Sequence, residues 1–124
     1  MIKNLDEFKV YGLSMQLGED VWEIVSRWNS FAKNAMGLQL VKAADSIASN
    51  LSEGLGRYHY KDVRNFSYFS RGSLFETKTW VTKSFNRRLI DEEKFRRLSD
   101  QGEIIGRMIN SYIRTLGPND KFTA

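Results

Sequence analysis

The sequence contains no cysteine, one histidine, one proline and no long apolar run. Without cysteine the chain cannot form a disulfide, a zinc ribbon, an iron–sulfur site or a thiol nucleophile. No apolar segment approaches the roughly 20 residues that a membrane-spanning helix needs, so we expect no membrane association. The first residues do not resemble a secretory signal peptide, and we therefore expect a cytoplasmic protein.

A chain of 124 residues is long enough for one globular domain that folds without a disulfide or metal. Because proline is scarce and neither strand-like alternation nor a hairpin signal occurs, the predicted fold class is all-α. Acidic first turns and glycine pairs suggest the helix boundaries. We predict helices over about residues 5–28, 34–55, 62–86 and 91–116 in a domain of residues 1–117, with a flexible C-terminal tail over 118–124.

Short connections favour antiparallel neighbours, so the predicted architecture is an up-down-up-down four-helix bundle. The last helix has the clearest core-facing stripe, with apolar residues three or four positions apart from Phe95 to Leu116. The second helix repeats this pattern from Leu40 to Leu55 with several small side chains. These two stripes predict the centre of the bundle.

The predicted first and third helices are apolar on more than one face. In the first, the stripe that contains Met15 and Trp22 is centred roughly 130° from the stripe that contains Leu17 and Val21. Either the core-facing sector is broad, or a second subunit covers the extra stripes in a homo-oligomer. In the third, the predicted seam is Phe66, Phe69, Ser73, Glu76 and Trp80, and the second face is Tyr68, Gly72 and Phe75.

The net charge of +4 is concentrated in one part of the chain. Residues 57–97 carry eleven basic and five acidic side chains, whereas residues 1–56 carry five and seven. On the third helix, Arg64, Arg71 and Lys78 recur every seven residues, about 10.5 Å apart on one predicted exposed face. Such a ladder can follow phosphates, or it can be an ordinary solvated helix face. The candidate nucleic-acid-binding residues are Arg57, Lys61, Arg64, Arg71, Lys78, Arg87 and Arg88.

A polar motif accompanies the apolar seams of the second and third helices. Its members are expected to make structural hydrogen bonds that fix the helix register, although two carboxylates in one groove could also act as acid and base. With a single histidine, His59, the chain lacks the Glu-x-x-His pairs of di-iron bundles, and no phosphate loop or catalytic triad is present. We therefore predict no catalytic residue, metal or cofactor. The motif consists of Ser46, Asn50, Glu53, Ser73 and Glu76.

The run from Leu40 to Arg57, with Phe66–Ser67 and the segment Arg71–Glu76, resembles the four-helix-bundle family of 23S rRNA intervening-sequence proteins over about residues 5–116. Leu51 stands where an isoleucine is commoner in the family. The resemblance implies a bacterial, cytoplasmic bundle that assembles into a cyclic homopentamer with a central channel. A related accessory variability protein of diversity-generating retroelements, similar in fold and assembly, interacts with a reverse transcriptase and nucleic acid through basic surfaces.

Three hypotheses about function follow. The leading one is a non-enzymatic homo-oligomer that binds RNA or DNA through phosphate contacts, with Tyr58, His59 and Tyr60 placed to stack on unpaired bases. The second is an oligomeric scaffold or adaptor for a protein partner. The third is an enzyme that uses Glu53 and Glu76, which stoichiometric metal in the purified protein would favour.

Overall fold

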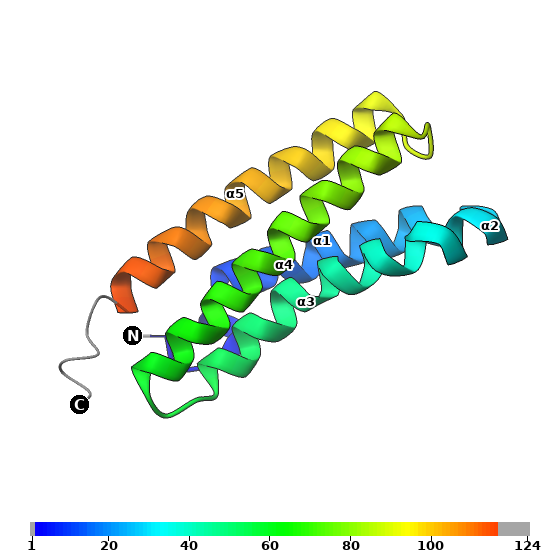
Figure 1. Cartoon of the computed structure of the whole chain (residues 1–124). Coiled ribbons are helices and arrows are strands. Elements are labelled where there is room, and N and C mark those ends of the chain that lie inside the picture. The colour runs from blue at the N-terminus through cyan, green and yellow to red at the C-terminus, as the bar shows by residue number, and fades with distance from the viewer. Residues whose placement is uncertain (1, 117–124) are drawn as a thin grey trace.

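A computed structural model describes residues 2–116, and the long segments in this range are all helical (Figure 1). The predicted tail over 118–124 lies outside the described residues. None of the described helices is both long and apolar enough to cross a membrane. The elements are the 3-10 turn η1 (Leu5–Glu7), α1 (Lys9–Ser26), α2 (Ser30–Ala32), the π-helical turn η2 (Lys33–Gly37), α3 (Leu38–Leu55), α4 (Tyr60–Asn86) and α5 (Glu92–Leu116).

The four long helices pack as an antiparallel bundle, which confirms the predicted fold. In Figure 1, α1, α3, α4 and α5 follow one another along the chain, each running back beside the one before it. α1 packs on α3, α3 on α4, α4 on α5, and α5 returns to α1. The helix that contributes most to the basic segment, α4, therefore lies between α3 and α5.

The observed helix boundaries differ from the prediction by four residues at two places: α1 begins at Lys9, after the 3-10 turn η1, instead of residue 5, and the second helix begins earlier than predicted. Asn29 lies one residue beyond the predicted first helix, and its side-chain oxygen accepts a hydrogen bond from Ala32 N at 2.9 Å. This is an N-cap, so the second helix begins at Ser30 instead of residue 34. It continues through the π-helical turn η2 into α3, and its last residue, Leu55, agrees with the prediction.

The predicted stripes of α3 and α5 lie in the core, and the stripe of α1 that contains Leu17 and Val21 packs against them. Leu17, Val21, Ile47, Ile105 and Ile109 are all almost completely buried. Two contacts close the ends of the bundle. The ring of Phe8 packs on Tyr112 at one end, and Trp28 Nε1 donates to the Leu89 carbonyl at 3.1 Å at the other.

The predicted seam of α4 is wrong. Phe69 and Glu76 are exposed, and Phe66, Ser73 and Trp80 are only half-buried. The buried stripe instead contains small hydroxyl residues. Ser67, Thr77 and Ser84 donate to a carbonyl on the preceding turn and Ser70 donates to α3, so these hydroxyls enter the core at little cost. The members of the stripe are Val63, Ser67, Ser70, Leu74, Thr77, Val81 and Ser84.

The hydroxyl stripe allows α3 and α4 to approach closely. Ser70 Oγ is fully buried and donates to the Ile47 carbonyl of α3 at 2.7 Å. A Cβ atom on Gly54 of α3 would lie 2.8 Å from Phe66 Cβ. Small residues occupy this contact, and Tyr68, Phe69 and Phe75 of α4 remain on its outer surface.

Candidate nucleic-acid interface

The basic ladder of α4 lies along its boundary with α5. Arg64, Arg71 and Lys78 are half-buried, which corrects the prediction of a fully exposed face. Arg71 Nη1 donates to Asn110 Oδ1 at 3.0 Å, and Lys78 Nζ lies 3.1 Å from Glu103 Oε1. These bonds hold the two cations against α5 and fix their positions along the ladder.

The adjoining surface of α5 carries two further cations that the sequence prediction missed. Arg107 lies between Glu103 and Asn110, four residues after one and three before the other, and Arg114 lies one turn beyond Asn110. All four positions are exposed. The sequence shows that Glu103, Arg107, Asn110 and Arg114 are four, three and four residues apart. This stripe can be placed beside the ladder of α4 only when its contacts with Arg71 and Lys78 are known.

Two aromatic rings lie among these charges. The Arg71 guanidinium carbon lies 4.9 Å from the centre of the Tyr68 ring, and Lys78 Nζ lies 5.2 Å from the centre of the Phe75 ring. Tyr68 remains 43% exposed and Phe75 61% exposed. We call this surface the α4–α5 face; it comprises Arg64, Tyr68, Arg71, Phe75 and Lys78 of α4 with Glu103, Arg107, Asn110 and Arg114 of α5.

The other predicted cations lie around this face or away from it. Lys61 is exposed seven residues before Tyr68, so it extends the face toward the start of α4. Arg57 lies on the side of α4 that faces α3, where its guanidinium carbon is 4.8 Å from the centre of the Phe66 ring. Arg87 and Arg88 lie in the connection between α4 and α5, and Arg88 has a positive φ of 63°.

Tyr58 of the α3–α4 connection and Tyr60, the first residue of α4, lie at the end of the bundle. Tyr58 and Tyr60 line a hollow at the end of the bundle together with Tyr112 and Leu116. The rings of Tyr58 and His59 contact each other edge to face, with their centres 4.9 Å apart. The residues expected to stack on bases are therefore grouped at one end of the ladder.

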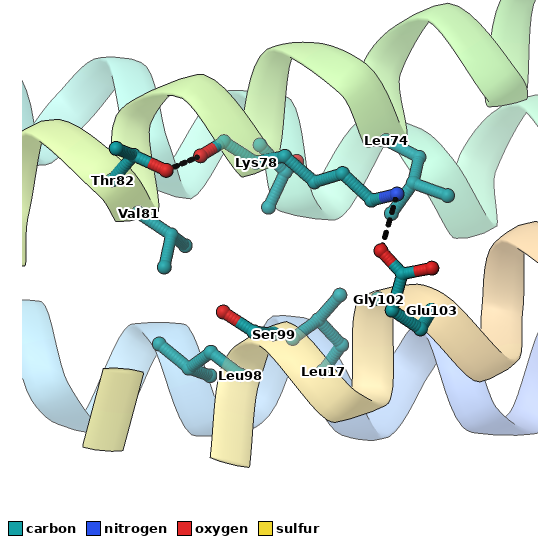
Figure 2. Close-up of a pocket in the computed structure, with 10 residues that line it drawn as sticks. Leu17, Leu74, Lys78, Val81, Thr82, Leu98, Ser99, Gly102 and Glu103 are labelled. Carbon is teal, nitrogen blue, oxygen red and sulfur yellow. Dashed lines mark hydrogen bonds and ion pairs between the residues drawn. The ribbon is translucent and has the colours of Figure 1, made fainter. Parts of the chain in front are cut away.

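Lys78 also covers a cavity between α1, α4 and α5. Figure 2 shows the side chain reaching from α4 toward Glu103 of α5, beside Leu74 and Gly102. The cavity has a volume of about 180 Å³, and Leu17 and Leu98 form part of its apolar wall. The alkyl part of Lys78 packs at the edge of this cavity while its ammonium group stays at the surface.

The polar motif lies on the neighbouring side, where α3 and α4 meet. Ser46 Oγ donates to the Lys42 carbonyl at 2.8 Å, and Asn50 Nδ2 donates to the Ser46 carbonyl at 2.9 Å. Glu53 lies 3.9 Å from Arg57, both being well exposed. On α4, the carbonyl of Ser73 accepts a bond from Thr77, and Glu76 Oε2 accepts one from Trp80 Nε1 at 3.3 Å. These bonds join residues of the same helix.

Glu53 and Glu76 do not share a site. Gly54, the neighbour of Glu53, lies against Phe66, whereas Glu76 is ten residues further along α4. Ten helical residues correspond to about 15 Å along the axis. Paired carboxylates that act on one bond lie within about 10 Å of each other. Across residues 2–116, no group of three or more His, Cys, Asp or Glu side chains could hold a metal ion.

The family assignment follows from a comparison with protein-family models. The model of the 23S rRNA-intervening sequence protein family matches residues 6–111. The chain belongs to this family. The match spans α1, α3, α4 and most of α5. It therefore includes the run from Leu40 to Arg57, the segment Arg71–Glu76 and the basic ladder. No curated protein matches the sequence.

Proposed function

We propose that this member of the 23S rRNA-intervening sequence protein family is a cytoplasmic, non-enzymatic homo-oligomer that binds nucleic acid through the α4–α5 face. The observation that carries the proposal is the charge of this face. Among residues 2–116, the face as defined carries five cations, those of Arg64, Arg71, Lys78, Arg107 and Arg114, and one carboxylate, that of Glu103. Such an excess of positive charge on one surface attracts a polyanion and releases its bound counterions.

The spacing and anchoring of the cations suit contacts to a phosphate backbone. Arg71 and Lys78 are about 10.5 Å apart along α4 and are already held by Asn110 and Glu103. Side chains held in place lose less conformational entropy when a ligand binds. Glu103 partly neutralises Lys78, so Arg71 and Arg107 supply most of the remaining positive charge of the central region.

A different surface is suited to a second copy of the chain. Trp22 of α1 is 60% exposed and Leu38 of α3 is 51% exposed, and with Val25 and Val41 they line an apolar hollow of about 310 Å³. Interface cores are depleted of charge, and this hollow contains one charged residue, Lys33. A ring of copies would repeat the α4–α5 face around its circumference; the expectation of five copies comes from the family resemblance.

Binding to a structured RNA tests the proposal with two variants of matched charge. One carries Arg64→Gln, Arg71→Gln and Lys78→Gln; glutamine is used because a glutamate at position 78 would lie against Glu103. The control carries Lys9→Gln, Arg27→Gln and Lys42→Gln, which remove three exposed cations in or next to α1 and α3, outside the α4–α5 face. We expect the first variant to bind at least tenfold more weakly than the wild type, and the control to differ by less than about threefold.

Two results would contradict nucleic-acid binding through the α4–α5 face. One is undetectable affinity of the wild type near physiological salt. The other is an equal loss of affinity in both triple variants, because net charge alone would then account for binding. One acidic protein that stays bound after nuclease treatment, in the absence of RNA affinity, would favour the adaptor hypothesis instead.

A further inference from the structure

We propose that the α4–α5 face selects single-stranded over double-stranded nucleic acid, by stacking unpaired bases on Tyr68 and Phe75. This selectivity rests on the nucleic-acid binding proposed above, and it specifies that the bound nucleic acid is single-stranded. Aromatic rings set along a basic groove are the usual means by which proteins hold single strands, since every base has a flat face that can stack. In a duplex the bases are already stacked on one another and present only their edges.

The two rings repeat as one unit along α4. Tyr68 precedes Arg71 by three residues and Phe75 precedes Lys78 by three, and in both pairs the cation lies over the ring. The units are seven residues apart, which corresponds to about 10.5 Å. One strand that follows α4 would place non-adjacent bases on the two rings, since stacked nucleotides are about 3.4 Å apart.

Gly72 leaves open helix surface between the two rings. It lies four residues after Tyr68 and three before Phe75, and a Cβ atom there would meet nothing within 4 Å. Glycine inside a helix is less stable than alanine, and nothing in this subunit requires it. A ligand that approaches the backbone between the rings would benefit from the missing side chain.

The charges around these rings favour nucleic acid over a second copy of the chain. Arg64, Arg71, Lys78 and Arg107 surround Tyr68 and Phe75, and an apolar partner surface would have to remove water from all of them. Phe69, on the side of α4 toward α3, is similarly exposed at 57% but lies outside the α4–α5 face. It therefore provides a matched control.

The experiment compares three labelled probes with the full-length protein at one salt concentration. They are a single-stranded oligouridine of about 16 nucleotides, an abasic strand of the same length, and a duplex RNA. The wild type should bind oligouridine at least about fivefold more tightly than the abasic strand, which has the same phosphates without bases. Equal affinity for these two strands would overturn base stacking, and equal affinity for oligouridine and the duplex would overturn the selectivity.

Two variants then assign the selectivity to the rings. Tyr68→Leu with Phe75→Leu should weaken oligouridine binding at least about tenfold, with little change for the abasic strand or the duplex. Phe69→Leu should change none of the three. Unchanged oligouridine binding in the double variant, or equal weakening of all three probes, would overturn base stacking. Binding through the α4–α5 face fails on different outcomes: the wild type binds no probe, or the triple glutamine variant of the ladder binds like the wild type or no more weakly than the control triple variant.

Discussion

Asp45 of α3 and Glu19 of α1 line one hollow at the contact between these helices. Burial, with a smaller contribution from the charge of Glu19, raises the pKa of Asp45 above its ordinary value of 3.8. A Cβ atom on Gly18 of α1 would lie 2.7 Å from Asp45 Oδ1, so the glycine makes room for this carboxyl group. At neutral pH a charged, partly dehydrated carboxylate therefore lies at a helix contact.

The raised pKa predicts how stability depends on pH. The native state holds the Asp45 proton more tightly than the unfolded chain, so this residue's contribution to stability falls as pH rises from about 3.8 through the raised native pKa. Asp45→Asn should raise the free energy of unfolding at pH 7, and the gain should shrink as the pH is lowered toward 4. Urea unfolding at several pH values measures this. A gain that did not change with pH would show that the carboxylate charge is not its cause.

At the scale of helices, two glycines should respond in opposite ways to alanine. In α3, a Cβ on Gly54 would lie 2.8 Å from Phe66 Cβ and 3.3 Å from the Val63 carbonyl, so Gly54→Ala should separate α3 from α4 and cost about 1–3 kcal/mol. In α4, Gly72 has open space, so Gly72→Ala should stabilise the fold by about 0.5–1 kcal/mol. Thermal or urea unfolding distinguishes them, and destabilisation by Gly72→Ala would contradict the open surface described here.

Helix number, order and approximate bounds could be predicted because α3 and α5 alternate apolar and polar residues with the helical period. The residues on the buried side of α4 could not be predicted in this way. Its buried positions include Ser67, Ser70 and Thr77, which count as polar in any hydropathy pattern, whereas Phe69 and Phe75 are exposed. The hydroxyls are acceptable in the core because Ser67 bonds the Val63 carbonyl and Ser70 bonds the Ile47 carbonyl of α3.

The candidate site could be predicted in part. The seven-residue repeat of Arg64, Arg71 and Lys78 in the sequence identified the ladder, and the structure places it along α5. The contributions of Arg107 and Arg114 depend on the pairing of α4 with α5, which no local pattern specifies. The exposure of Tyr68 and Phe75 likewise follows from the close packing of α3 on the other side of α4.

At the scale of the whole molecule, the apolar hollow between α1 and α3 predicts self-association. Trp22→Lys with Leu38→Lys would place two charges at this surface, and removing water from them costs far more than the contacts return. Sedimentation should give an oligomer for the wild type and a smaller species for the double variant. Phe75→Lys, on the α4–α5 face, should leave the mass unchanged. A monomeric wild type at micromolar concentration would contradict the homo-oligomer.

The salt dependence of RNA affinity tests the central claim most directly. Each phosphate contact to a single strand contributes about −0.7 to the slope of the logarithm of the association constant against the logarithm of salt concentration. Loss of Arg64, Arg71 and Lys78 as cations should therefore make the slope shallower by about 2 relative to the wild type, while the control triple variant keeps the wild-type slope. Equal slopes in the wild type and the ladder variant would show that nucleic acid does not contact the α4–α5 face.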